Sequence, residues 1–139
     1  MAYMGQPPDQ PRLLEHLKAA GITRQPQPDA GEDMAYVQFS QQGYEMRFDR
    51  TSDGLGLFLR SITAYPSGDA THQPFAGELP QGIQAGDVRA DLHAKLGLPA
   101  FHNKVFNTDM WKTGELELVV RFDKVANTIK IVQVNAPKR

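Results

Sequence analysis

The chain has 139 residues and contains no cysteine. Disulfide scaffolds, thiolate metal sites and cysteine nucleophiles are therefore excluded. Long apolar runs are also missing, since none approaches the roughly 18–20 residues that a membrane-spanning helix needs. The first residues lack the basic and then apolar pattern of a signal peptide. From these features we expect a cytoplasmic protein.

The sequence also carries little net charge, with a formal value of −1 at pH 7. This value argues against strong nonspecific attraction to nucleic acid or to an anionic membrane as the main activity. The hydrophobic fraction of 40% and the charged fraction of 22% are those of an ordinary soluble globular protein. A chain of this length buries enough apolar surface to fold as one compact body.

Motifs for common enzyme chemistry are also missing. The sequence contains no Gly-x-Ser-x-Gly, no phosphate-binding loop, no dinucleotide fingerprint and no His-Glu-x-x-His. His93 and His102 are close enough in sequence to suggest a metal site with Asp91 or Asp109, but they lack a tight ligand spacing. We therefore predict no metal, no cofactor and no catalytic residues. An enzyme, as the opposing reading, would depend on His93, His102 or Asp109.

The positive signal is a short motif that occurs twice. Residues 44–49 read Tyr-Glu-Met-Arg-Phe-Asp and residues 118–123 read Leu-Val-Val-Arg-Phe-Asp, each with a glycine just upstream. Each motif follows a short amphipathic helix and precedes a β-rich run. We predict an α+β fold of two tandem helix-plus-antiparallel-meander units, residues 1–75 and 76–139, with the helices packed on one face of the sheet.

Local signals place the elements of these units. The predicted helices begin after Asp9 and Asp87 as N-caps and end at Gly21 and Gly97. The predicted strands are 34–40, 44–49 and 56–65 in the first unit, and 109–113, 115–123 and 128–135 in the second. Residues 101–108 are expected to form a long connection.

Alternation along the strands separates two faces of the sheet. Leu118, Val120 and Phe122 share the face expected under the helices, so that Arg47 and Arg121 lie on the other. That other face is either the solvated side of an ordinary antiparallel sheet or a binding surface. Trp111, the only tryptophan, has two similar readings: a core residue that seals the helix–sheet layer, or an interface anchor.

The second half of the chain carries a longer pattern. It reads Leu79-Pro80-x-Gly82-Ile83-x-x-Gly86-Asp87, then Leu96-Gly97-x-Pro99, then Asp109-x-Trp111. This pattern resembles the helix–sheet module of the small outer-membrane assembly lipoproteins, which occurs in tandem in the β-lactamase inhibitor proteins. It is also similar to immunity proteins that are paired with bacterial toxins. The match covers residues 79–134 and implies a tandem fold and a partner-binding role.

The resemblance and the missing catalytic motifs together give the functional expectation. We expect a noncatalytic immunity protein that binds a cognate toxin of bacterial competition, such as a type VI secretion effector, and occludes its active site. The alternative is a secretion chaperone for an exported effector. Neither role involves nucleic acid or a membrane. The expected partner contacts are Arg47, Arg121, Trp111, Phe101 and Asp109.

Overall fold

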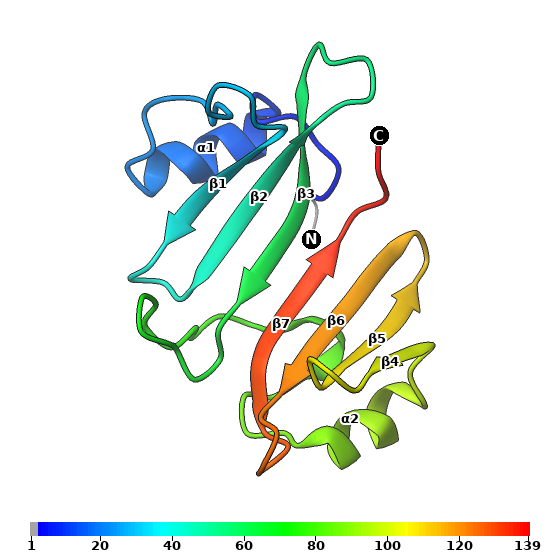
Figure 1. Ribbon diagram of the computed structural model, residues 1–139. Coiled ribbons are helices and arrows are strands. Elements are labelled where there is room, and N and C mark those ends of the chain that lie inside the picture. Colours follow the sequence, from blue (N-terminus) through cyan, green and yellow to red (C-terminus); the bar gives the residue numbers. More distant parts are fainter. Residues whose placement is uncertain (1–2) are drawn as a thin grey trace.

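The structure is a computed structural model and describes residues 3–139. Its helices are α1 (Pro11–Ala19) and α2 (Arg89–Leu96), with a single 3-10 turn, η1 (Pro80–Gly82). Its strands are β1 (Met34–Phe39), β2 (Tyr44–Arg50), β3 (Leu57–Ala64), β4 (Phe101–Asn103), β5 (Thr108–Thr113), β6 (Leu116–Phe122) and β7 (Ile129–Asn135). Over these residues the strands form one antiparallel sheet in the order β1-β2-β3-β7-β6-β5-β4 (Figure 1). The predicted α+β class is confirmed.

The sheet consists of two meanders that meet at its centre. Strands β1 to β3 form one, β4 to β7 form the other, and β3 pairs with β7 between them. The prediction of a strand-free connection over residues 101–108 is wrong, so the second half has four strands instead of three. Asn103 explains the extra strand, because its side-chain oxygen accepts hydrogen bonds from the backbone of Val105 and Phe106 and closes a tight turn into β5.

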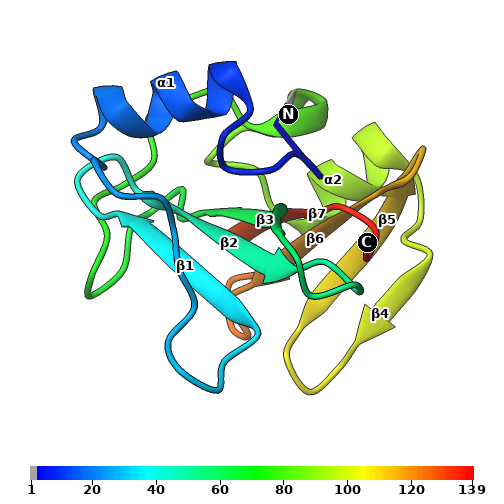
Figure 2. The ribbon, with the colours of Figure 1, turned by 90° about the horizontal axis from the view of Figure 1, so that it is seen from above.

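Both helices lie on the same side of the sheet (Figure 2). Leu13 and Leu17 of α1 and Leu92 of α2 are buried against the sheet core, which includes Phe48 and Phe122. Burying one such side chain stabilises the fold by roughly 1.5–3 kcal/mol. Among residues 3–139, no helix is long and apolar enough to cross a membrane.

The predicted N-caps of the two helices are wrong. Gln10 caps α1, where its side-chain oxygen accepts a hydrogen bond from the third helical N–H at 2.8 Å. Val88 occupies the N-cap position of α2, one residue after Asp87. The Asp87 carboxylate lies 2.6 Å from the ammonium group of Lys95 instead. This ion pair links the residue that precedes the N-cap of α2 to the last turn of the helix.

Candidate partner-binding face

The sheet face turned away from the helices carries side chains in rows that run from strand to strand. Residues that are directly opposite in neighbouring strands share a face, so the register gives each row. One row crosses all seven strands and contains Gln38, Glu45, Thr63, Gln133, Val119, Met110 and Phe101. It is polar at the β1 edge and apolar at the β4 edge. The neighbouring row on the same face contains Tyr36, Arg47, Ser61, Asn135, Glu117 and Lys112, and it is charged over β5 and β6. The apolar end over β4, β5 and β6 therefore belongs to the first row alone.

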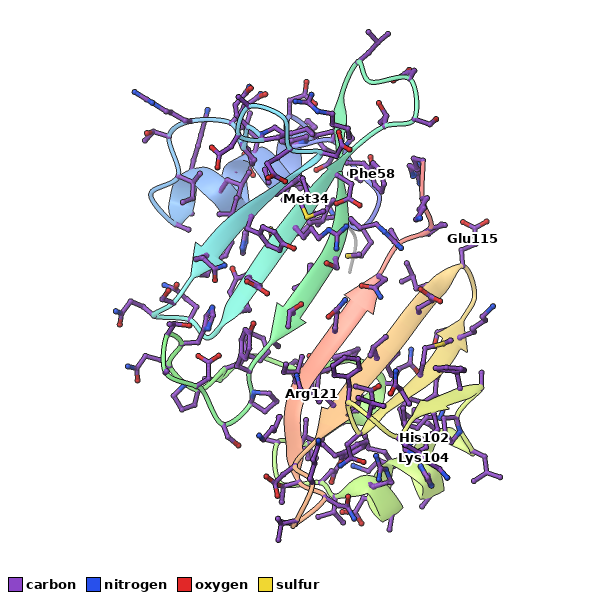
Figure 3. The ribbon with its side chains drawn as sticks, viewed as in Figure 1. Met34, Phe58, His102, Lys104, Glu115 and Arg121 are labelled. Atoms are coloured by element: carbon purple, nitrogen blue, oxygen red, sulfur yellow. The ribbon has the colours of Figure 1, made fainter. Side chains whose placement is uncertain are left out.

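At that apolar end, Phe101, Val105, Phe106 and Arg121 form a group that we call the β4 patch. The side chains of Phe101 and Phe106 are 58% and 55% exposed. The guanidinium carbon of Arg121 lies 5.9 Å from the centre of the Phe106 ring, within range of a cation–π contact. Figure 3 shows Arg121 at the same end of the sheet as the turn after β4. Exposed aromatic side chains beside an arginine are the residue types that dominate binding hot spots.

Arg47 also lies on this face but is bound to a neighbour. Its guanidinium donates two hydrogen bonds to the Asp49 carboxylate, at 2.7 and 3.1 Å. These bonds to Asp49 raise the pKa of Arg47. Arg60 approaches the same carboxylate at 3.8 Å. The two predicted arginines therefore share a face but differ in chemistry, because the charge of Arg47 is already neutralised whereas Arg121 contacts an aromatic ring.

Asp109 lies on the opposite, helix-covered face and is only 1% exposed. Its carboxylate is 2.6 Å from Nδ1 of His102, 2.8 Å from Nε2 of His93 and 3.1 Å from Nε of Arg89. An ionised carboxylate only accepts, so each of these nitrogens donates. Burial alone would raise the pKa of Asp109, but hydrogen bonds from His93 and His102 and the charge of Arg89 outweigh it and lower the pKa.

The Asp109 cluster is therefore an internal clamp. It ties α2, through Arg89 and His93, to β4, through His102, across a carboxylate on β5. We expected Asp109 to meet a basic group on the partner, but the structure buries its carboxylate on the helix-covered face, where three side chains donate to it. Asp109 acts on the open face only indirectly. It holds His102, which keeps strand β4 and the neighbouring Phe101 in position.

Trp111 is a core residue in this structure. Its side chain is 6% exposed and faces the helices. Its indole N–H donates to the backbone carbonyl of Gly97 at 3.0 Å. Of the two readings that the sequence left open, the geometry favours the one in which Trp111 seals the layer between α2 and the sheet.

The Asp109 clamp contains two histidines and a carboxylate, which are residue types that ligate metal ions. Within residues 3–139, no group of three or more His, Asp or Glu side chains is arranged to hold a metal ion. In the Asp109 clamp, the positive charge of Arg89 lies 3.1 Å from one carboxylate oxygen. The Asp109 carboxylate therefore acts as an internal counterion for the basic side chains of α2 and β4.

Three residues of this region were missed by reasoning from the sequence. Val105 and Phe106 are two adjacent apolar residues in a polar turn between Asn103 and Asn107, and that contrast was the available signal. Arg89 carried no such signal, because its partner Asp109 is 20 positions away in the chain.

No protein-family model matches the chain, and no curated protein sequence matches it. Solved structures share its fold. A cysteine-rich secretory protein from Staphylococcus aureus is 10% identical, with a TM-score of 0.59 over 97% of this chain and 44% of that one. A DUF4309 family protein from Bacillus subtilis is 14% identical, with a TM-score of 0.50 over 88% of this chain and 76% of that one. The chain spans less than half the length of the staphylococcal protein. At these identities the likeness concerns the fold alone.

Proposed function

We propose that this chain is a noncatalytic immunity protein, which binds a cognate bacterial toxin and covers its active site. The observation that carries the proposal is the β4 patch, in which the exposed Phe106 lies beside Arg121 and the exposed Phe101 lies on the same strand end of the open face. An inhibitor of this kind needs a rigid surface and a few strong anchors, and it needs no reactive groups.

Rigidity at the patch supports the proposal. Strand β4 is only three residues long, yet it pairs with β5 and is held from beneath by the His102–Asp109 contact of 2.6 Å. A surface that is already ordered loses little conformational entropy when it binds, so more of the contact energy appears as affinity. We propose Phe101 and Arg121 as direct contacts, together with Phe106 and Val105. Trp111 and Asp109 would act by positioning them.

We also propose that the two halves of the chain, residues 1–75 and 76–139, are tandem repeats. Each half has a helix followed by an antiparallel meander, and the last strands of the halves pair at the centre. A further parallel supports the repeat. In the first half the register of β2 with β3 shifts between Arg47 and Phe48, and in the second half the register of β6 with β7 shifts between Arg121 and Phe122. The same bulge therefore falls at the same point of the repeated Arg-Phe-Asp motif.

The test is co-expression in bacteria with each neighbouring gene of its genome. We expect one neighbour to arrest growth when expressed alone and to be tolerated when this protein is present. The Phe101→Ala/Arg121→Ala double variant should lose the protection while it stays folded, and the Leu55→Ala variant, which removes an exposed apolar side chain elsewhere, should retain it. The proposal fails if no neighbour is toxic, or if this protein relieves no toxicity.

The oligomeric state of the purified complex separates this role from that of a secretion chaperone. An immunity protein is expected to hold a folded toxin in a one-to-one complex, whereas a chaperone would dimerise and hold an extended segment of an effector. Light scattering of the complex measures its stoichiometry. Limited proteolysis of the partner measures whether it is folded. A one-to-one complex with a protease-resistant partner supports the immunity role.

A further inference from the structure

The helix-covered side of the sheet holds a cavity of about 250 Å3 over the central strands β2, β3 and β7. It lies on the other side of the sheet from the β4 patch and has no part in the function proposed above. Its floor is apolar, and its lining includes Tyr3, His16, Tyr44, Phe75 and Glu78.

The lining combines aromatic rings with one carboxylate. Tyr3, Tyr44 and Phe75 contribute three rings, and Glu78, an exposed residue, is the only acidic residue of the lining. No lysine or arginine belongs to the lining, and its one basic side chain, His16, is hydrogen-bonded through Nε2 to the Tyr44 hydroxyl. Aromatic faces attract cations through their quadrupole, and a cluster of rings is the usual device for recognising alkylated ammonium groups. A nearby carboxylate adds charge complementarity to such a site.

The aromatic walls are held in place by contacts within the protein. The Tyr44 hydroxyl is hydrogen-bonded to Nε2 of His16 at 2.5 Å. The Tyr44 ring stacks on Phe39 with centroids 4.4 Å apart, and meets the edge of Phe75 at 5.8 Å. Gly43 lets the segment of Phe75 approach closely, because a Cβ at Gly43 would lie 2.6 Å from the Phe75 backbone nitrogen. The Tyr44 and Phe75 walls are therefore packed in place without a ligand.

We propose that this cavity binds an alkylammonium group, with its alkyl part on the apolar floor and its charge near the three rings and Glu78. The volume lies just below the 300–1,000 Å3 that is usual for drug-sized ligands, so the bound group is small. Two sources carry this chemistry: a small free amine such as choline, and the side chain of a lysine. Both are compared in the experiment.

Calorimetric titration of the full chain with choline tests the charge requirement directly. Its control is 3,3-dimethylbutan-1-ol, which has the same shape but a carbon in place of the positive nitrogen. We expect saturable binding of choline and binding of the neutral alcohol at least about tenfold weaker, a difference between that of an exposed and that of a desolvated cation–π contact. Equal binding of the two compounds would overturn the proposal, since the cavity would then be merely apolar.

A matched pair of variants assigns the site. Glu78→Gln removes the cavity carboxylate, and Glu115→Gln removes a carboxylate in the turn between β5 and β6, which does not line this cavity (Figure 3). Choline affinity should fall several-fold in the first variant and stay unchanged in the second. Nα-acetyl-lysine methylamide, titrated in parallel, identifies the source by whether it binds more tightly than choline. Absence of saturable binding of both ammonium compounds, or an unchanged affinity in Glu78→Gln, refutes the site.

Discussion

Trp111 donates its indole N–H to the backbone carbonyl of Gly97 at 3.0 Å, and so joins strand β5 to the residue that ends helix α2. The ring of His93 meets the indole edge-on, with centroids 6.1 Å apart. The single tryptophan therefore sits between the helix and the sheet, where its loss opens the layer. We therefore expect the stability of the second half of the chain to depend strongly on Trp111.

The first prediction follows from that position. Replacing Trp111 by Ala should lower the free energy of unfolding by about 3–5 kcal/mol, because a large buried aromatic side chain is lost and a cavity remains. Trp111→Phe should cost less, since the ring stays buried and only part of the volume and one hydrogen bond are lost. Urea denaturation followed by circular dichroism measures both. A Trp111→Ala variant of normal stability but weak partner binding would instead make this residue an interface anchor.

The second prediction concerns Asp109 and acid. Its pKa is lower in the folded protein than in the unfolded chain, so the unfolded state binds protons first as the pH falls. The stabilisation is complete above the unfolded value of about 3.9 and is lost as the pH falls through the folded pKa. In Asp109→Asn this acid-dependent part should vanish, and at neutral pH the variant should lose roughly 1.5–3 kcal/mol, as expected for a hydrogen-bonded charge.

Urea denaturation at a series of pH values from neutral to strongly acidic measures this difference between the two proteins. Asp29→Asn, a change in an exposed loop, is the matched control and should follow the parent protein throughout. If Asp109→Asn kept the same acid dependence as the parent protein, the clamp formed with His93, His102 and Arg89 would not be the source of that stabilisation.

The sequence predicted the long elements well, for a physical reason. Alternation over six to eight residues is a strong local signal, and the helices and the strands other than β4 lie within a few residues of their predicted bounds. Strand β4 has three residues, too few for alternation to show, and it depends on its pairing with β5. Local patterns do not contain that pairing.

Site residues were harder to predict because their roles depend on distant partners. The alternation that puts Trp111 under the helices puts Asp109 there too, two positions earlier. A buried carboxylate is stable only when polar groups donate to it, and the donors here are Arg89 and His93 of helix α2 and His102 of strand β4. Likewise, the two arginines stand in the same Arg-Phe-Asp motif, so no local signal shows that Arg121 contacts the ring of Phe106 whereas Arg47 pairs with the Asp49 carboxylate.

The third prediction compares two glycines that occupy similar positions before the repeated motif. Gly43 and Gly114 both have left-handed backbone angles, with φ of 80° and 63°. A Cβ at Gly114 meets nothing within 4 Å, whereas one at Gly43 would lie 2.2 Å from the carbonyl oxygen of Gln73. Gly114→Ala should therefore cost about 1–2 kcal/mol from backbone strain alone. Gly43→Ala should cost more, by about 1–3 kcal/mol for the steric overlap.

Thermal and urea unfolding of the two alanine variants measure the difference. Similar losses in both would mean that the segment of Gln73 moves aside without cost. In that case the close packing of this segment against Gly43 would contribute little to stability, and the Phe75 wall of the cavity would be less firmly held than its contacts indicate.

The last prediction separates binding from stability at the β4 patch. Phe101→Ala, Phe106→Ala and Arg121→Ala remove exposed or partly exposed groups, so each should change the free energy of unfolding by no more than about 0.5 kcal/mol. If the patch is the centre of the interface, at least one of them should weaken partner binding by about 2 kcal/mol or more. Arg47→Ala should weaken binding less, because Asp49 already neutralises that charge.

A double-mutant cycle between Arg121 and Phe106 tests the patch as a unit. Their contact of 5.9 Å predicts that the two losses of binding free energy are not additive, by about 0.5 kcal/mol or more, because each side chain helps to position the other. Val125→Ala, which removes an almost fully exposed side chain in the turn between β6 and β7, is the control for nonspecific loss of apolar surface. Normal affinity in Arg121→Ala, Arg47→Ala and Phe101→Ala together would show that the partner binds elsewhere, because these variants alter both the β4 end of the face and strand β2 near its other edge. Weak binding confined to the patch variants would instead locate the interface over β4, β5 and β6.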